Sequence, residues 1–167
     1  MKKPGLWRAV TTAALAGAAV LTAVVPAGAD VRPTRPCAAG EISAEIGEGR
    51  SPNPSTSRLF TISLKGNEGV SCLLSGALDY IRFYDTSGRP MDVRFSDKFA
   101  VAPFENVWVD DFRRPVVYVS APAGNGGMPI GSMTFSVPTA PESELTAAWP
   151  APAGGPLMLT KIMQPVS

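Results

Sequence analysis

Carboxylates and two cysteines are the residues through which this chain could perform chemistry, because its 167 residues include no histidine. Without an imidazole, Ser-His-Asp and Cys-His nucleophile pairs and histidine-ligated zinc sites are excluded. Carboxylates gather in the middle of the chain, where a pair could catalyse glycoside hydrolysis or several oxygens could hold calcium. The members of this group are Asp79, Asp85, Asp92, Asp97, Glu105, Asp110 and Asp111.

These carboxylates also have a simpler interpretation. Asp85 stands where aspartate commonly begins a turn, Asp92 is expected on the same side as Arg94, and residues 110–111 are followed by two arginines at 113–114. Solvated ion pairs therefore account for the group. We expect no metal site, no cofactor and no enzymatic activity, and a carboxylate-dependent hydrolase is the less favoured alternative.

A second candidate site is a stripe of Tyr80, Arg82 and Tyr84 that alternates with Ile81 and Phe83. If the two apolar residues point inward, the other face presents two aromatic rings beside a guanidinium, a composition that is enriched at recognition surfaces. The stripe predicts contact with a protein or cell-envelope partner. The alternative is that a neighbouring loop buries the tyrosines, or that they cover the stem of Arg82.

Residues 121–131 form a glycine-rich loop that contains Met128. The loop lacks the lysine and the following helix of a phosphate-binding P-loop, so a flexible hairpin connection is the simplest interpretation. An exposed Met128 as the anchor of a protease-inhibitor loop is a less favoured alternative, because such loops are usually held rigid by nearby disulfides.

The first 29 residues, Met1–Ala29, have the organisation of a secretory signal peptide. Lys2, Lys3 and Arg8 make a basic start, residues 9–25 are uncharged, and an A-x-A pattern predicts cleavage between Ala29 and Asp30. A membrane anchor is less favoured because the uncharged run is rich in Ala, Gly and Thr and is barely long enough to span a bilayer. Secretion of the remaining chain is the expected outcome.

Removing the leader takes away three of the 15 basic residues and none of the 14 acidic ones, which leaves a net charge of −2. A slightly acidic chain without a basic cluster is not expected to bind nucleic acid. Lipidation is not expected either, because Cys37 lies well beyond the apolar run and follows Arg35-Pro36.

Cys37 and Cys72 are the two cysteines of the chain, and in an exported protein they predict one disulfide. The bond would close a loop of about 36 residues and contribute roughly 3 to 4 kcal/mol of stability. A reactive thiol or a metal site is not supported, because the chain has no C-x-x-C motif and no histidine.

Alternation of apolar and polar residues with a period of two dominates the chain after a proline-containing extended tail at residues 30–36. A hairpin is expected where residues 80–84 and 91–95 flank a turn at Asp85–Pro90, with Gly88 in its positive-φ position. Prolines make regular sheet improbable between residues 140 and 156, although residues 143–149 could form one helical turn or a short edge strand. The other expected strands cover residues 42–46, 60–64, 70–74, 105–109, 115–120, 132–137 and 157–162.

About nine short strands separated by Gly and Pro predict an all-β protein, an antiparallel immunoglobulin-like β-sandwich. A single domain at residues 37–167 is expected, because its length suits one hydrophobic core.

The first half of this domain resembles an uncharacterised actinobacterial family of secreted or lipid-anchored domains. The likeness covers residues 37–88: an N-x-G turn at Asn67-Glu68-Gly69, then C-x-L-x-G from Cys72 to Gly76, then an apolar strand that ends in Asp85 and a glycine turn. The chain departs from the family where a G-Y-P sequence often follows, and it lacks the second cysteine pair that many members carry. The resemblance implies a secreted immunoglobulin-like domain with no established activity.

These observations together predict a secreted, non-enzymatic β-sandwich that binds a protein or cell-envelope partner. A purely structural or accessory module without a discrete site is the alternative. An exposed Tyr80–Arg82 surface would favour the binding module.

Overall fold

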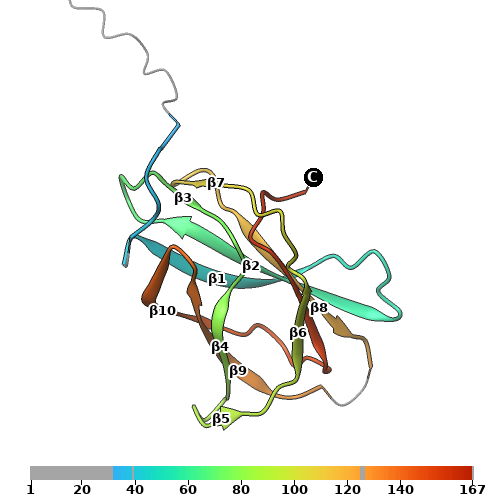
Figure 1. Ribbon diagram of the computed structural model, residues 1–167. Helices are drawn as coiled ribbons and strands as arrows, with labels where there is room; N and C mark the ends of the chain where they lie inside the picture. The colour runs from blue at the N-terminus through green and yellow to red at the C-terminus, as the bar shows by residue number, and fades with distance from the viewer. Residues whose placement is uncertain (1–31, 39, 125–126, 167) are drawn as a thin grey trace, which may run out of the picture. The chain divides into compact units, whose positions relative to one another are not determined.

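The computed structural model of the chain (Figure 1) describes residues 32–38, 40–124 and 127–166, and within these ranges it contains strands and no helix. The expected leader, with the Ala29–Asp30 junction, lies outside the described residues. No helix that could cross a membrane occurs within the described ranges. The all-β prediction is confirmed.

The strands are β1 (Ile42–Gly49), β2 (Ser57–Gly66), β3 (Cys72–Leu74), β4 (Asp79–Asp85), β5 (Pro90–Met91), β6 (Phe95–Phe99), β7 (Val107–Val109), β8 (Val116–Pro122), β9 (Ile130–Val137), β10 (Ala140–Ala148) and β11 (Leu157–Thr160).

The strands form three sheets. The largest has the order β1-β2-β8-β11-β6, the second β10-β9-β4-β5, and β3 pairs with β7 in a small third sheet. The expectation of a purely antiparallel arrangement is wrong for β6, which runs parallel to β11. The reason is topological: the chain crosses from β5 in the second sheet to the open edge of the first and enters it in the same direction as β11.

Alternation in the sequence predicted β1 and β2 correctly. Ile42 and Ile46 are buried on β1, and alternate residues of β2, namely Phe60, Ile62 and Leu64, are fully buried. The two strands pair antiparallel with Ile46 opposite Ile62. Because side chains on a strand alternate between its faces, this register directs both apolar sets into the same core.

The core joins the two larger sheets through aromatic contacts. The Trp149 ring lies 4.8 Å from that of Phe60 on β2 and 5.9 Å from that of Phe83 on β4, measured between centroids. All three residues are buried. Trp149 therefore links side chains of both sheets, as expected for a core residue.

The turn between β4 and β5 forms as predicted. The Asp85 carboxylate accepts hydrogen bonds from the Ser87 hydroxyl and from the backbone N–H groups of Ser87 and Arg89, and Arg89 also forms an ion pair with it. These bonds, above all that from the Ser87 hydroxyl, lower the pKa of Asp85 well below its usual range. Gly88 has φ +79°, a conformation that glycine adopts without strain.

The predicted return strand at residues 91–95 is wrong in its extent. β5 ends at Met91, and Phe95 begins β6 in a different sheet. Val93 is nevertheless buried. The alternation of residues 91, 93 and 95 therefore spans a crossing between two sheets rather than one continuous strand, and of the three only Val93 is buried.

The expectation that residues 140–156 avoid regular sheet is also wrong, because β10 occupies Ala140–Ala148. β10 is an edge strand that pairs only with β9, and the register shifts between Ala140 and Leu145. Pro141 falls within that irregular stretch, where the ladder does not need its missing N–H. Leu145, Ala147 and Trp149 are buried in alternation, which agrees with the edge-strand alternative for residues 143–149.

Candidate binding surface

Tyr80 occupies a β-bulge at the start of β4. Asp79 pairs with Ser136 and Arg82 pairs with Thr134. Two residues of β4 therefore lie between these pairs, opposite one residue of β9. Tyr80 has φ +51°, a conformation that is costly for a bulky side chain, and 62% of its surface is exposed. The fold thus maintains backbone strain at a position where the tyrosine ring projects toward solvent.

Arg82 and Tyr84 share one face of the second sheet, opposite Thr134 and Ser132 on β9. Arg82 is exposed and lies 3.9 Å from the Glu144 carboxylate on β10, whereas Tyr84 is half-buried. The bulge breaks the expected alternation between Tyr80 and Arg82. The structure therefore brings the residues of the predicted stripe close together along β4 without placing all three on one regular face.

Exposed phenylalanines form a feature that sequence reasoning missed. Of the seven phenylalanines, Phe60, Phe83 and Phe135 are buried in the core. The remaining four are at least 42% exposed, and three of them belong to β6 and the segment that follows it, together with the exposed Val101. They are Phe95, Phe99, Phe104 and, in the loop after β7, Phe112.

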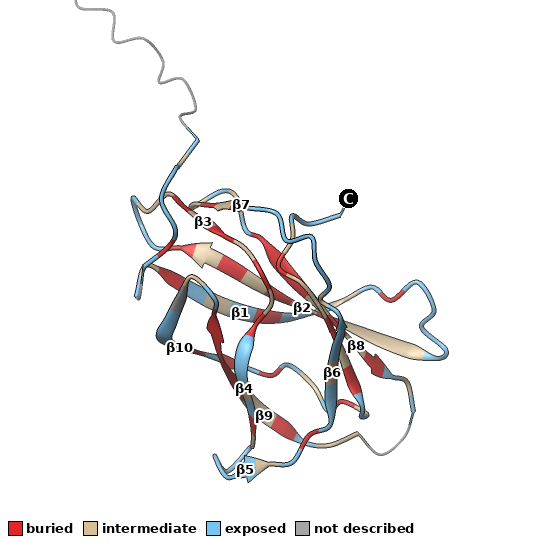
Figure 2. Cartoon of the chain, in the orientation of Figure 1, coloured by how far each residue is buried: buried red, intermediate tan, exposed pale blue. Residues whose placement is uncertain are grey.

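β4 and β6 belong to different sheets, and much of β6 and the beginning of β4 are exposed (Figure 2). The Phe95 and Phe83 rings are 6.2 Å apart, which joins the two strands. β5 pairs only with Phe83 and Tyr84, and β6 is the edge of its sheet. We call the exposed residues Tyr80, Phe95 and Phe99 of these two strands the aromatic flank.

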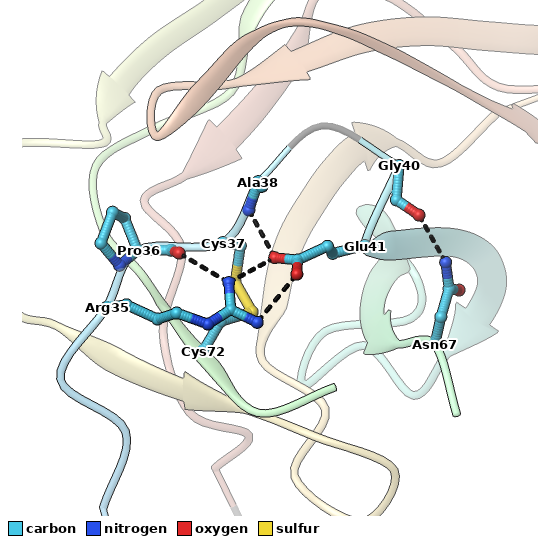
Figure 3. A network of polar contacts seen from close by, with 8 residues as sticks. All are labelled: Arg35, Pro36, Cys37, Ala38, Gly40, Glu41, Asn67 and Cys72. Carbon is cyan, nitrogen blue, oxygen red and sulfur yellow. Dashed lines mark hydrogen bonds and ion pairs between the residues drawn. A yellow bond between two sulfur atoms is a disulfide. The ribbon is translucent and has the colours of Figure 1, made fainter. Parts of the chain in front are cut away.

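The disulfide between Cys37 and Cys72 is present as predicted, and both cysteines are buried. It attaches the N-terminal segment to β3, where the Cys37 N–H donates to the Leu73 carbonyl and the Leu73 N–H donates to the Arg35 carbonyl. The folded unit therefore includes Arg35 and Pro36, at the end of the expected tail, as Figure 3 shows.

Arg35 and Glu41 form a polar clamp beside this disulfide (Figure 3). The Arg35 guanidinium donates two hydrogen bonds, of 2.7 and 2.8 Å, to the two Glu41 carboxylate oxygens, and the Ala38 N–H donates a third. The bonds from Arg35 and then that from Ala38 lower the pKa of Glu41. Asn67, in the predicted N-x-G turn, donates to the Gly40 carbonyl and fixes the other side of the segment.

We expect Glu41→Gln to destabilise the protein at pH 7 and to have a much smaller effect at pH 3. A carboxylate whose pKa is lowered by folding stabilises the native state above its ordinary pKa of 4.5, and this contribution disappears as the pH falls through the folded value. Urea unfolding of wild type and variant at both pH values measures the difference. Glu45→Gln, at an exposed position of β1, is the matched control. An equal loss for both variants at pH 7 would contradict the clamp.

The central carboxylates contact cations or solvent. Asp85 pairs with Arg89 and Asp110 with Arg113, as the ion-pair interpretation predicted. Within the described ranges, no three Asp, Glu, Cys or His side chains are grouped in a way that could hold a metal ion. Of the central carboxylates, Asp85 and Asp110 are thus held in ion pairs within turns.

Met128 does not fit the protease-inhibitor alternative. It is half-buried against the core, and it exchanges two backbone hydrogen bonds with Ala153. The structure therefore does not support the less favoured alternative of an exposed Met128 anchor, because pairing with residue 153 holds this side of the glycine-rich loop against the protein.

An open groove of about 410 Å³ lies beside β7 and is lined in part by Arg32, Trp108, Arg113 and Gln164. The Arg113 guanidinium stacks 3.6 Å from the centre of the Trp108 ring. The Trp108 indole N–H donates to the Ser71 hydroxyl at 2.8 Å. Trp108 is therefore a half-buried residue at the edge of the core. Its indole nitrogen is held by the hydrogen bond to Ser71, and one face of its ring is covered by Arg113.

Comparison of the chain with protein-family models, curated proteins and solved structures finds no match. The functional argument consequently depends on the surface geometry described above.

Proposed function

We propose that this protein is a secreted, non-enzymatic binding module that recognises a protein or cell-envelope partner through the aromatic flank and Arg82. Its fold is proposed to be immunoglobulin-like, with residues 1–29 as a cleaved signal peptide. We also propose that it belongs to the uncharacterised actinobacterial family that its first half resembles. Sequencing of the secreted protein should begin at Asp30, and a sequence that begins at Met1 would contradict export by cleavage.

The observation that carries the binding proposal is the exposure of the aromatic flank. Large apolar side chains usually enter the core, and those that gather on a surface commonly mark an interaction site. Here Tyr80, Phe95 and Phe99 are 62%, 42% and 51% exposed. The neighbouring guanidinium of Arg82 adds a residue type that is enriched among energetically important contacts.

Site-specific cross-linking tests this proposal. A photoreactive phenylalanine analogue replaces Phe99 in the exported protein, and the same analogue replaces Glu45 on β1 as a control at an exposed position. We expect a specific adduct from position 99 alone. The purified partner should bind the double variant Tyr80→Ser/Phe99→Ser at least about 10-fold more weakly than wild type. Equal adducts from both positions, or unchanged affinity of the double variant, would contradict a binding role for the flank.

Tyr80→Gly is expected to increase stability while it weakens partner binding. Glycine removes a left-handed backbone penalty of about 1–2 kcal/mol, and its larger unfolded-state entropy costs about half of that gain. The net increase in unfolding free energy should be about 0.5–1 kcal/mol. Chemical denaturation measures it, and Tyr84→Gly is the control because Tyr84 has no positive φ and should lose stability. A destabilised Tyr80→Gly variant would show that the bulge does not strain the backbone.

A further inference from the structure

The loop between β7 and β8 is held rigid by hydrogen bonds around Asp110. Its carboxylate accepts the Phe112 N–H at 2.8 Å, the Arg113 N–H at 2.6 Å and the Arg113 guanidinium at 2.7 Å. Its own N–H donates to the Arg113 carbonyl. Burial raises the pKa of Asp110, but the hydrogen bonds from Arg113 and Phe112 outweigh burial and leave that pKa below its usual value.

Two further contacts fix this loop to the body of the protein. Arg113 stacks on Trp108, and the Trp108 indole N–H donates a hydrogen bond to the hydroxyl of Ser71, which precedes β3. The backbone of Asp110 packs closely against Gly66, where an added Cβ would lie 3.2 Å from the Asp110 Cα. The loop thus has one preferred conformation, set by both its own bonds and its neighbours.

Phe112 at the tip of this rigid loop is 91% exposed, more than any other large apolar side chain among the described residues. A surface loop that only reverses the chain has no need of an aromatic residue, and polar residues satisfy the same backbone conformation. A rigid loop that holds a phenylalanine in solvent has little conformational entropy to lose when the ring becomes buried. These are the properties of a preorganised anchor for a complex.

The surroundings of the loop indicate the charge of its partner. Arg114, the next residue after the cation–π pair, is exposed. Two adjoining grooves beside β7, of about 410 and 300 Å³, are lined by three basic side chains, Arg32, Arg113 and Lys161, and by one acidic side chain, Glu105. The grooves are complementary to acidic groups, whereas a second copy of the chain docked through the same face would bring two sets of basic grooves together.

We propose that Phe112 is the anchor of a second binding surface, separate from the aromatic flank, and that it inserts into an apolar pocket bordered by acidic side chains on a partner protein. A lipid surface fits less well, because Phe112 is a lone aromatic in its loop and one apolar side chain buries too little surface to hold a protein in a bilayer. The inference does not depend on the proposed role of Tyr80 and Phe99.

The test combines cross-linking with affinity measurements on the full exported chain. A photoreactive phenylalanine analogue at position 112 should form an adduct with one protein, and excess unlabelled wild type should compete the adduct away. The same analogue at position 166 is the control, because Val166 is also 70% exposed. Binding of the purified partner should weaken at least about 30-fold for Phe112→Ser, as expected for a central anchor, and less than about 3-fold for Val166→Ser. Arg114→Gln should weaken binding of the partner by a larger factor at low salt than at high salt.

Four results would overturn the inference. The first is that position 112 forms no adduct, or forms one that unlabelled wild type does not compete away, and the second is that Phe112→Ser binds with unchanged affinity. The others are an adduct with a second copy of the chain and Phe112-dependent binding to phosphatidylglycerol vesicles. Phe112→Ser should retain the thermal unfolding temperature of wild type, which separates lost binding from lost folding. A specific adduct from position 99 without one from position 112 would leave the aromatic flank in place and remove only this second surface.

Discussion

Replacing both cysteines, in the variant Cys37→Ala/Cys72→Ala, is expected to lower the free energy of unfolding by about 4 kcal/mol. The two cysteines are separated by 35 positions, and a cross-link of this span removes much of the conformational freedom of the unfolded chain. Both side chains are also buried, so the variant loses packing as well as the covalent bond. Urea unfolding of wild type and variant measures the loss.

The loss of stability should be greatest in the N-terminal segment that the disulfide attaches and in the strand β3 that this segment contacts. Arg35, Pro36 and Cys37 contact β3 through the bond itself and two backbone hydrogen bonds to Leu73. Amide hydrogen exchange in the variant should therefore become faster at Cys72 and Leu73 than at Phe60 in β2. Wild type treated with reductant is the control and should show most of this loss, because it keeps both sulfur atoms but not the bond between them. A loss below about 1 kcal/mol would contradict this account of the disulfide.

The parts of the fold that the sequence predicted correctly depend on signals between neighbouring residues. Residues 42–46 and 60–64 alternate cleanly and became β1 and β2, because a strand buried on one face imposes this period. The turns at Asn67–Gly69 and Asp85–Pro90 were equally predictable. Gly69 has φ +73° and Gly88 has φ +79°, and each turn also begins with a side chain suited to accept or donate local hydrogen bonds.

The errors arise where alternation is compatible with several tertiary arrangements. Residues 91, 93 and 95 alternate, yet periodicity cannot show that the chain leaves one sheet before Phe95 and joins another. The prolines of residues 140–156 suggested an absence of sheet, but an edge strand accommodates Pro141 where its register shifts. The alternation of Leu145, Ala147 and Trp149 was the signal that favoured β10.

The candidate surface was predictable only in part. Arg82 is exposed as expected, whereas the bulge at Tyr80 depends on its pairing with β9, which no local pattern reveals. Phe112 could have been recognised, because two acidic residues precede it and two arginines follow it, so its immediate neighbours are unsuited to a core. Phe99 gave a weaker signal, since Asp97 and Lys98 precede it but the apolar Ala100 and Val101 follow it.

Phe60→Ala is expected to lower the free energy of unfolding by about 3–5 kcal/mol, while Phe112→Ala should change it by less than about 0.5 kcal/mol. The same atoms are removed in both variants, so the comparison isolates burial: Phe60 is 0% exposed and packs against Trp149, whereas Phe112 is 91% exposed. Equilibrium urea unfolding measures both values. If Phe112→Ala proved as destabilising as Phe60→Ala, the ring would belong to the core and could not serve as an anchor. If both predicted values are found, the Phe112 side chain contributes almost nothing to folding, and the rigid loop that holds it in solvent requires an explanation outside the folded chain, which binding provides.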